Sequence, residues 1–113
     1  MIKYSNDSAI INDLTAAEVE LLSHAAEEAA EVIAIIGKIL RHGKSSKNPY
    51  NDEPCNSVLL SQELGNLIFL KNLLEAKSIV SSEELIKGFI NKANKFNKYS
   101  HNVKIIENFW DKM

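Results

Sequence analysis

Apolar side chains recur at helical spacing through residues 15–43. They are separated by three, four or seven positions, as residues on one face of a helix are, and they comprise Leu21, Ala25, Val32, Ile35 and Ile39. Thr15 and Glu18 have the spacing of a capping box at a helix start. Gly43 can adopt the left-handed conformation that ends many helices. The pattern therefore predicts a first helix of about 28 residues that starts at Thr15 and ends before Gly43.

Two further helices are predicted downstream. Residues 44–55 include both prolines and many small polar side chains, so this segment is expected to be a loop. A second helix is expected from about Asn56 to Lys77, with an apolar stripe of Leu60, Leu64, Leu67, Leu70 and Leu74. A third is expected from Ser81, which repeats the cap pairing with Glu84, and its inward-facing residues are Leu85, Phe89, Ala93 and Phe96.

These elements predict an all-α fold. Residues 103–113 are expected to form a short fourth helix or an arm that packs on a neighbour, and no segment shows the alternation of a strand. The 113 residues are interpreted as a single domain, because a chain of this length has room for one compact core. Helical proteins of this size often extend that core by pairing with another copy of themselves.

Composition and charge limit the cellular compartments and the binding partners that are expected for this protein. Cys55 is the only cysteine, so one chain can form neither a disulfide nor a cysteine-based zinc site. The start lacks the regions of a signal peptide, and no apolar run approaches membrane-spanning length. We therefore expect a cytoplasmic protein without a membrane partner. The net charge is −2, but acids gather in residues 1–33 and five lysines with no acid in residues 86–104.

A carboxylate interrupts the apolar stripe of the first predicted helix. At about 100° per residue, Glu28 lies within about 20° of Leu21 and Ile39, in the middle of the stripe. Glu31 lies about 60° away, one turn along, at the edge of the stripe. Glu27 lies farther round, at about 100°. Glu28 is therefore predicted to face the interior, where a leucine would be ordinary.

The second predicted helix repeats the anomaly. Glu63 falls about 40° from Leu67, and Asn66 occupies the same edge one turn later. Burying carboxylates without a partner is costly, so a cation is expected between the two helices. Oxygen-bearing pairs at i, i+3 on facing helices suit Mg²⁺ or Mn²⁺. A di-iron site would instead require Glu-x-x-His, which does not occur in this sequence.

Basic residues flank these acidic positions in the sequence. The segment "KILRHGKSSK" precedes the second helix, and "KGFINKANKFNKYSH" forms much of the third. A Mg²⁺ ion held by few protein ligands usually takes phosphate oxygens from a substrate. Cations on both sides of an acidic site suit a polyphosphate, whose charge exceeds what one or two metal ions neutralise.

The order of these segments resembles a known family. Glu28 and Glu31 form Glu-x-x-Glu, and after a basic loop Glu63-Leu-Gly-Asn66 is similar to the Glu-x-x-Asp of the MazG-like all-α nucleoside triphosphate pyrophosphohydrolases. The stretches "LTAAEVELLSHAAEEAAEVIAIIGKILRHG", "NSVLLSQELGNL" and "NKANKFNKYSHN" resemble, in order, small members from bacteriophages and bacteria, over about residues 14–102. Members are helical bundles completed by dimer or tetramer formation. With Mg²⁺ they cleave nucleoside triphosphates to monophosphate and pyrophosphate, in control of the nucleotide pool.

The resemblance implies a role for each candidate residue. The metal ligands would be Glu28, Glu31, Glu63 and Asn66. Water would attack phosphorus in line with departing pyrophosphate, with catalytic assistance from Glu27, Glu28 and Glu31, of which Glu27 or Glu31 would orient the water. The triphosphate would be bound by Lys38, Arg41, Lys92, Lys95, Lys98 and Tyr99. Base selection would involve His24, Asn56 or a partner chain. The resemblance thus predicts a homodimer or homotetramer that binds a nucleoside triphosphate and Mg²⁺ or Mn²⁺.

Asn66 departs from the family pattern, which has aspartate at this position. An asparagine oxygen can ligate Mg²⁺, but it carries no charge and cannot accept a proton from water. Three interpretations remain: an active enzyme with a looser metal site, an enzyme in which Glu27 compensates, or a homologue that binds nucleotide without hydrolysing it. A helical interaction module would explain the amphipathic helices but not the inward carboxylates. A nucleic-acid-binding protein is opposed by the acidic first helix and by the low pI.

Structural roles also compete for the individual side chains. A glutamate at the edge of an apolar stripe can pair with a lysine across an oligomer interface. Lysines spaced along a helix most often form a solvated face. His24, His42 and His101 have no metal-ligand spacing, and Cys55 lies in a polar segment where no chemistry is indicated. The sequence alone does not separate dATP, dGTP, dCTP, dUTP or a damaged nucleotide as the substrate.

Overall fold

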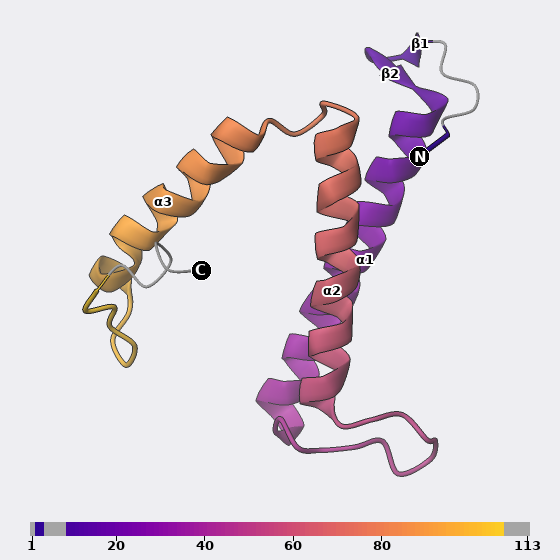
Figure 1. Ribbon diagram of the computed structural model, residues 1–113. Coiled ribbons are helices and arrows are strands. Elements are labelled where there is room, and N and C mark those ends of the chain that lie inside the picture. Colours follow the sequence, from indigo (N-terminus) through magenta and orange to yellow (C-terminus); the bar gives the residue numbers. More distant parts are fainter. Residues whose placement is uncertain (1, 4–8, 108–113) are drawn as a thin grey trace. The chain divides into compact units, whose positions relative to one another are not determined.

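The computed structural model describes residues 2, 3 and 9–107 and divides the chain into two units, Met1–Ile79 and Val80–Met113. The elements in chain order are β1 (Ala9–Ile11), β2 (Leu14–Thr15), α1 (Ala16–His42), α2 (Asn56–Ala76) and α3 (Ser82–Tyr99) (Figure 1). The described chain is predominantly helical, and the three helices lie where the sequence predicted them.

A short hairpin precedes α1 and corrects the expectation that no strand is present. β1 and β2 pair in antiparallel fashion. The two residues between them, Asn12 and Asp13, have φ angles of 53° and 64°. Positive φ at both loop positions is the geometry of the tight turn that suits the twist of a hairpin, and Asn and Asp tolerate it. Strands of two or three residues are too short to show a readable alternation.

α1 begins and ends as its sequence predicts. The Thr15 N–H donates to Glu18 Oε1 at 2.9 Å, and the Glu18 N–H donates to Thr15 Oγ1 at 3.2 Å, so both halves of the capping box are formed. At the other end the Gly43 N–H donates to Ile39 O at 2.8 Å. Gly43 has a φ of 97°, which a side chain would disfavour. Arg41 and His42 are basic residues in the last turn, where they interact favourably with the negative end of the helix dipole.

α1 and α2 form an antiparallel helical hairpin (Figure 1). Its core lies along their seam, where Ile35 is 5% exposed and Leu70 is also buried. The predicted stripe residues of α1 are all buried or half-buried, namely Leu21, Ala25, Val32, Ile35 and Ile39. The stripe of α2 is less complete because Leu64 is exposed. The 3.6-residue period thus identified the seam correctly, and Glu28 and Glu63 share it as half-buried side chains.

Few apolar residues are buried in the part of the chain that the structure describes. Ala17, Ile35 and Leu70 are the buried hydrophobic residues. Large apolar residues of α1 and α2 that stay exposed include Ile33, Ile36, Leu40, Leu64, Ile68 and Phe69. None of the described helices combines the length and the apolar character needed to cross a membrane.

The second unit contains α3 and the segment that follows it. The Ser81 hydroxyl accepts a hydrogen bond from the Glu84 N–H at 3.3 Å. The Glu84 carboxylate binds Lys87 Nζ at 3.1 Å, so only the serine half of the predicted capping box is observed. Near the end of α3, Asn97 Nδ2 donates to Ile105 O at 2.7 Å, and the Ile105 N–H donates to Asn97 Oδ1 at 2.7 Å. Residues 101–107 contain no helix, and the remainder of the predicted C-terminal element lies outside the described residues.

Replacing the capping threonine should destabilise α1. Thr15→Ala removes the acceptor for the Glu18 N–H and should lower the free energy of unfolding by about 1 kcal/mol. Thr15→Ser keeps the hydroxyl and is the matched control, with a change of a few tenths of a kcal/mol at most. Urea unfolding followed by circular dichroism measures both. Equal stability of Thr15→Ala and the wild type would show that the capping bonds do not persist in solution.

Candidate functional site

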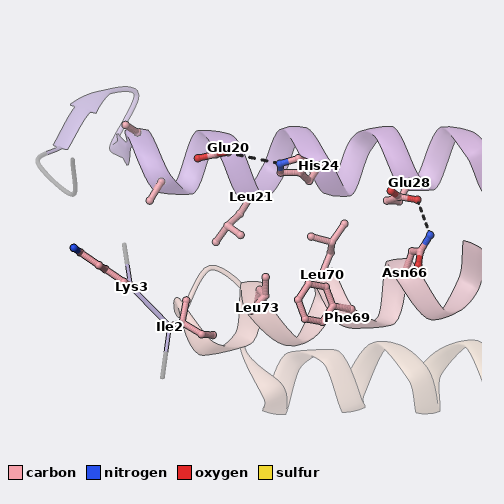
Figure 2. A pocket seen from close by; sticks show the side chains of 12 residues that line it. Ile2, Lys3, Glu20, Leu21, His24, Glu28, Asn66, Phe69, Leu70 and Leu73 are labelled. Atoms are coloured by element: carbon pink, nitrogen blue, oxygen red, sulfur yellow. Dashed lines mark hydrogen bonds and ion pairs between the residues drawn. The ribbon is translucent and has the colours of Figure 1, made fainter. Parts of the chain in front are cut away.

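Three polar side chains meet at the seam between α1 and α2. Asn66 Nδ2 lies 3.4 Å from Glu28 Oε2 and 3.4 Å from Glu63 Oε2. Glu28 comes from α1, whereas Glu63 and Asn66 are one turn apart on α2, and Figure 2 shows Glu28 and Asn66 directed toward each other across the seam. A single amide group therefore donates to two carboxylates from different helices.

The proximity of the carboxylates raises the pKa of Glu63. The largest cause is a hydrogen bond with the Glu28 carboxyl group, which requires that one of the two groups hold a proton. Partial burial and the negative charge of Glu28 act in the same direction, whereas the hydrogen bond from Asn66 lowers the pKa. The charge of Glu31 raises it further. Glu28 and Glu31 thus both act electrostatically on Glu63.

The remaining predicted acidic residues lie at the margin of this cluster. Glu31 and Glu27 are exposed on α1. Within residues 2, 3 and 9–107, no three His, Cys, Asp or Glu side chains are grouped closely enough to hold a metal ion by themselves. The converging donors are instead two carboxylates and one amide, and an amide can offer its oxygen as a ligand when its orientation is reversed. Oxygen donors of this kind fit a hard cation such as Mg²⁺.

A cavity of about 710 Å³ opens beside the carboxylates in the first unit. Glu28 and Asn66 lie at one end of it, and Leu21, Leu70 and Leu73 contribute apolar surface to its wall (Figure 2). His24 also lines it, with Nε2 4.0 Å from the Glu20 carboxylate. A mixed apolar and polar wall next to an acidic cluster is typical of a small-molecule binding site.

The structure separates the predicted substrate-binding residues into three groups. His24 lines the cavity at the carboxylates. Lys38, Arg41 and Asn56 line a different cavity of about 320 Å³, where α1 ends and α2 begins. The third group belongs to the second unit and consists of the exposed side chains Lys92, Lys95, Lys98 and Tyr99 on α3. Lys98 Nζ lies 5.5 Å from the centre of the Tyr99 ring, within the range of a cation–π contact.

Sequence reasoning missed several residues of the larger cavity. Ile2, Lys3, Glu20, Phe69 and Leu73 line it, and none has a motif or a spacing that points to it. Ile2 and Lys3 reach it from the start of the chain (Figure 2). Leu73 and Phe69 could have been found only by projecting the α2 sequence around the helix once its partner was known.

Cys55 caps α2 without a side-chain hydrogen bond to the helix backbone. Its thiol lies 3.6 Å from the Ser57 hydroxyl, and this contact is the main cause that lowers the pKa of Cys55. The sequence placed Cys55 at the end of a polar loop, and the structure agrees, with Cys55 directly before the first residue of α2.

Comparison of the chain with protein-family models, with curated proteins and with solved structures finds no match.

Neutralising Glu63 should stabilise the metal-free protein as the pH rises. A raised pKa means that the folded state favours protonated Glu63, so the associated stability is present below about pH 4.3 and is lost as pH rises through the folded pKa. Glu63→Gln should therefore melt at the same temperature as the wild type near pH 4 and at a higher temperature near pH 8. The measurement is a set of thermal melts in EDTA across this range.

Asp52→Asn is the matched control, because Asp52 is exposed in the segment between α1 and α2. It removes one negative charge of the same unit without touching the seam. A rise of equal size for Asp52→Asn would mean that overall charge, and not the contact of Glu63 with Glu28, causes the effect.

Proposed function

We propose that the protein is a Mg²⁺-dependent nucleoside triphosphate pyrophosphohydrolase that releases a nucleoside monophosphate and pyrophosphate. The observation that supports this most directly is the meeting of Glu28 and Glu63 at Asn66, beside a cavity of about 710 Å³. The resemblance of the acidic motif and its flanking segments to MazG-like proteins supports the same reaction. The proposed cellular role is control of the nucleotide pool in the cytoplasm of a bacterium or of a phage-infected host.

Glu28, Glu31, Glu63 and Asn66 are the proposed ligands of the metal ion. Mg²⁺ prefers six oxygen ligands and commonly takes several of them from water and from phosphate groups, so two or three protein oxygens suffice. The Asn66 NH₂ group lies between the two carboxylates and partly offsets their repulsion. When bound, Mg²⁺ or Mn²⁺ would supply Lewis acidity at the phosphate oxygens.

Other residues near the carboxylates are proposed to position the attacking water and the nucleotide. A water molecule attacks the α-phosphorus, the bond from that phosphorus to the oxygen bridging to the β-phosphate breaks, and pyrophosphate departs in line. Glu27 or Glu31 orients this water and accepts its proton. Leu21, Leu70 and Phe69 offer apolar surface for the base and sugar in the cavity. His24, at the same wall, is the proposed polar contact.

The lysines of α3 are the proposed counter-charges of the triphosphate. Lys92, Lys95 and Lys98 recur every three residues and are exposed, so they present positive charge along one side of the helix. They stand in the region that the MazG-like resemblance assigns to triphosphate binding, together with Tyr99.

Binding without hydrolysis is the second candidate function, and Asn66 is the observation that favours it. Aspartate at this position would add a negative charge to the ligand set, whereas the amide of Asn66 is neutral and donates to both neighbouring carboxylates. A neutral ligand lowers the affinity for the cation. The outcome would be a nucleotide-binding protein that turns its ligand over slowly or not at all.

We further propose that the chain assembles as a homodimer or homotetramer through the outer face of α1. Apolar residues on this face alternate in steps of four and three, as in a coiled-coil seam, and they are Leu22, Ala26, Ala29, Ile33, Ile36 and Leu40. Ile33 is 71% exposed and Leu40 is 81% exposed. We name this set the outer stripe. A second copy that offers the same stripe would bury it on both sides, as a symmetric interface requires.

The proposed reaction is tested with a panel of ribo- and deoxyribonucleoside triphosphates and Mg²⁺ or Mn²⁺. We expect equal amounts of monophosphate and pyrophosphate, scored by ion-exchange chromatography. Glu28→Gln should lower the rate at least about 100-fold, because even groups that only support a metal ligand contribute 10- to 100-fold. Asp52→Asn is the control and should keep the wild-type rate. Release of inorganic phosphate from the γ-position would contradict the proposed bond cleavage.

Asn66→Asp tests whether the neutral ligand has reduced activity. The added carboxylate should lower the Mg²⁺ concentration needed for half-maximal rate, with a rate that rises or stays unchanged. Without metal the same variant should melt at a lower temperature, because a third negative charge joins Glu28 and Glu63 at the seam. A clear loss of activity at saturating Mg²⁺ would show that the asparagine amide has a role of its own.

Leu40→Glu should weaken the proposed assembly. Sedimentation equilibrium of the wild type should give a mass of two or four times 12.6 kDa. Loss of one buried leucine in each copy should raise the dissociation constant at least about tenfold. Ala34→Glu places the same charge on an exposed position of α1 outside the outer stripe and should leave the mass unchanged. A wild-type mass of one chain at all concentrations would refute the assembly.

A further inference from the structure

A second cavity lies where α1 ends and α2 begins, and its walls are held by hydrogen bonds. Its volume is about 320 Å³. The Asn56 N–H donates to Ser46 O at 2.9 Å, and the Ser57 N–H donates to Lys44 O at 2.9 Å. The Asn56 side chain donates through Nδ2 to Gly43 O at 3.2 Å. These three bonds close the base of the segment between the helices and fix the wall of the cavity there.

The cavity is lined by more basic than acidic side chains. Its basic side chains are Lys38, Arg41, His42 and Lys47, and Glu53 is the one carboxylate in its wall. Within the described residues, neither Arg41 nor either of the two lysines forms an ion pair with a carboxylate. Three permanent positive charges against one negative charge leave an excess that favours an anion. The positive end of the α2 dipole at Asn56 and the negative end of the α1 dipole at His42 both lie at this cavity and oppose each other, so the excess of positive charge comes from the side chains.

The Arg41 side chain lies close to α1 because residue 37, one turn earlier, is a glycine. Its Nη1 lies 3.2 Å from the point where a Cβ atom of residue 37 would stand, so Gly37 leaves room for the guanidinium group to fold back along α1. The guanidinium group can present two parallel N–H donors to phosphate oxygens. Asn56 is only 7% exposed, and its Oδ1 accepts no hydrogen bond within the described part of the chain. This oxygen can accept from a protonated phosphate oxygen.

This cavity is separate from the carboxylate site. The two cavities share no lining residue. Lys38 follows Glu28 by ten residues on α1, which corresponds to about 15 Å along the helix axis. A phosphate group in contact with Arg41 therefore does not touch the Glu28 carboxylate. The two sites have opposite charge and can be examined independently.

We infer that the cavity between α1 and α2 binds a phosphate group without a metal ion. The ligand is inorganic phosphate or the terminal phosphate of a nucleotide, held by Arg41, Lys38 and Lys47 with Asn56 at the base. The inference does not rest on the proposed hydrolysis, because no residue of the carboxylate site takes part. A site of this kind gives the protein a second contact with a phosphate-bearing molecule, in addition to the proposed substrate.

The first test is isothermal titration calorimetry of the full chain with sodium phosphate in EDTA at low ionic strength. Arg41→Gln should weaken binding about tenfold or more, because it removes a charged hydrogen-bond donor. Lys44→Gln is the control, since Lys44 is an exposed lysine of the same segment that does not line the cavity. Circular dichroism checks that both variants are folded. Added phosphate should also shift the NMR signal of the Asn56 side-chain amide.

Two further comparisons identify the source of the phosphate, and one variant tests whether the site is independent of the carboxylates. Equal affinity for inorganic phosphate and a nucleoside monophosphate would assign the site to the phosphate group alone. Tighter binding of the monophosphate, with no binding of the nucleoside, would assign it to nucleotides. Glu28→Gln should bind phosphate as the wild type does, whatever its hydrolytic activity. The inference is overturned if phosphate does not bind, or if Arg41→Gln and Lys44→Gln weaken binding equally.

Discussion

The repulsion between two carboxylates at one helix seam is the constraint on which this structure depends. Glu28 and Glu63 stand on different helices and are half-buried, and the amide of Asn66 donates to both at 3.4 Å. Two like charges at an apolar seam lower stability unless a proton, an amide or a cation stands between them. The raised pKa of Glu63 reports the same conflict. The contact between Glu28 and Glu63 thus lowers the stability of the fold at the place where the proposed reaction requires negative charge.

The rest of the first unit supports this seam. The Thr15 capping box fixes the start of α1, and the bonds from Asn56 and Ser57 to the preceding segment fix the start of α2. With both starting points set, the antiparallel packing brings Glu28 opposite Asn66. The seam buries few large side chains, so much apolar surface is left on the outer stripe of α1. The small core and the exposed heptad pattern have the same cause, because the helical hairpin has too few packing surfaces to bury all of its apolar side chains.

Opposite charges occupy different places along the same helical hairpin. The carboxylates and Asn66 adjoin the larger cavity, whereas Lys38, Arg41 and Asn56 surround the smaller one at the turn between the helices. This separation keeps the basic side chains from neutralising the acidic cluster, as the proposed cation site requires. As a result, the same amide group occurs in two different environments, at Asn66 and at Asn56. Asn66 is exposed between carboxylates, and Asn56 is buried at a loop base.

The sequence by itself determined the three helices, the capping box of α1 and the inward direction of Glu28 and Glu63, because period and capping are local properties of a helix. Only the tertiary structure decided which residues meet across the seam, since that depends on the length and closure of the segment between the helices. It therefore placed Lys38, Arg41 and Asn56 apart from the carboxylates and added Lys3 and Phe69 to the larger cavity. It also revealed the hairpin before α1, whose strands are too short for a period to be read.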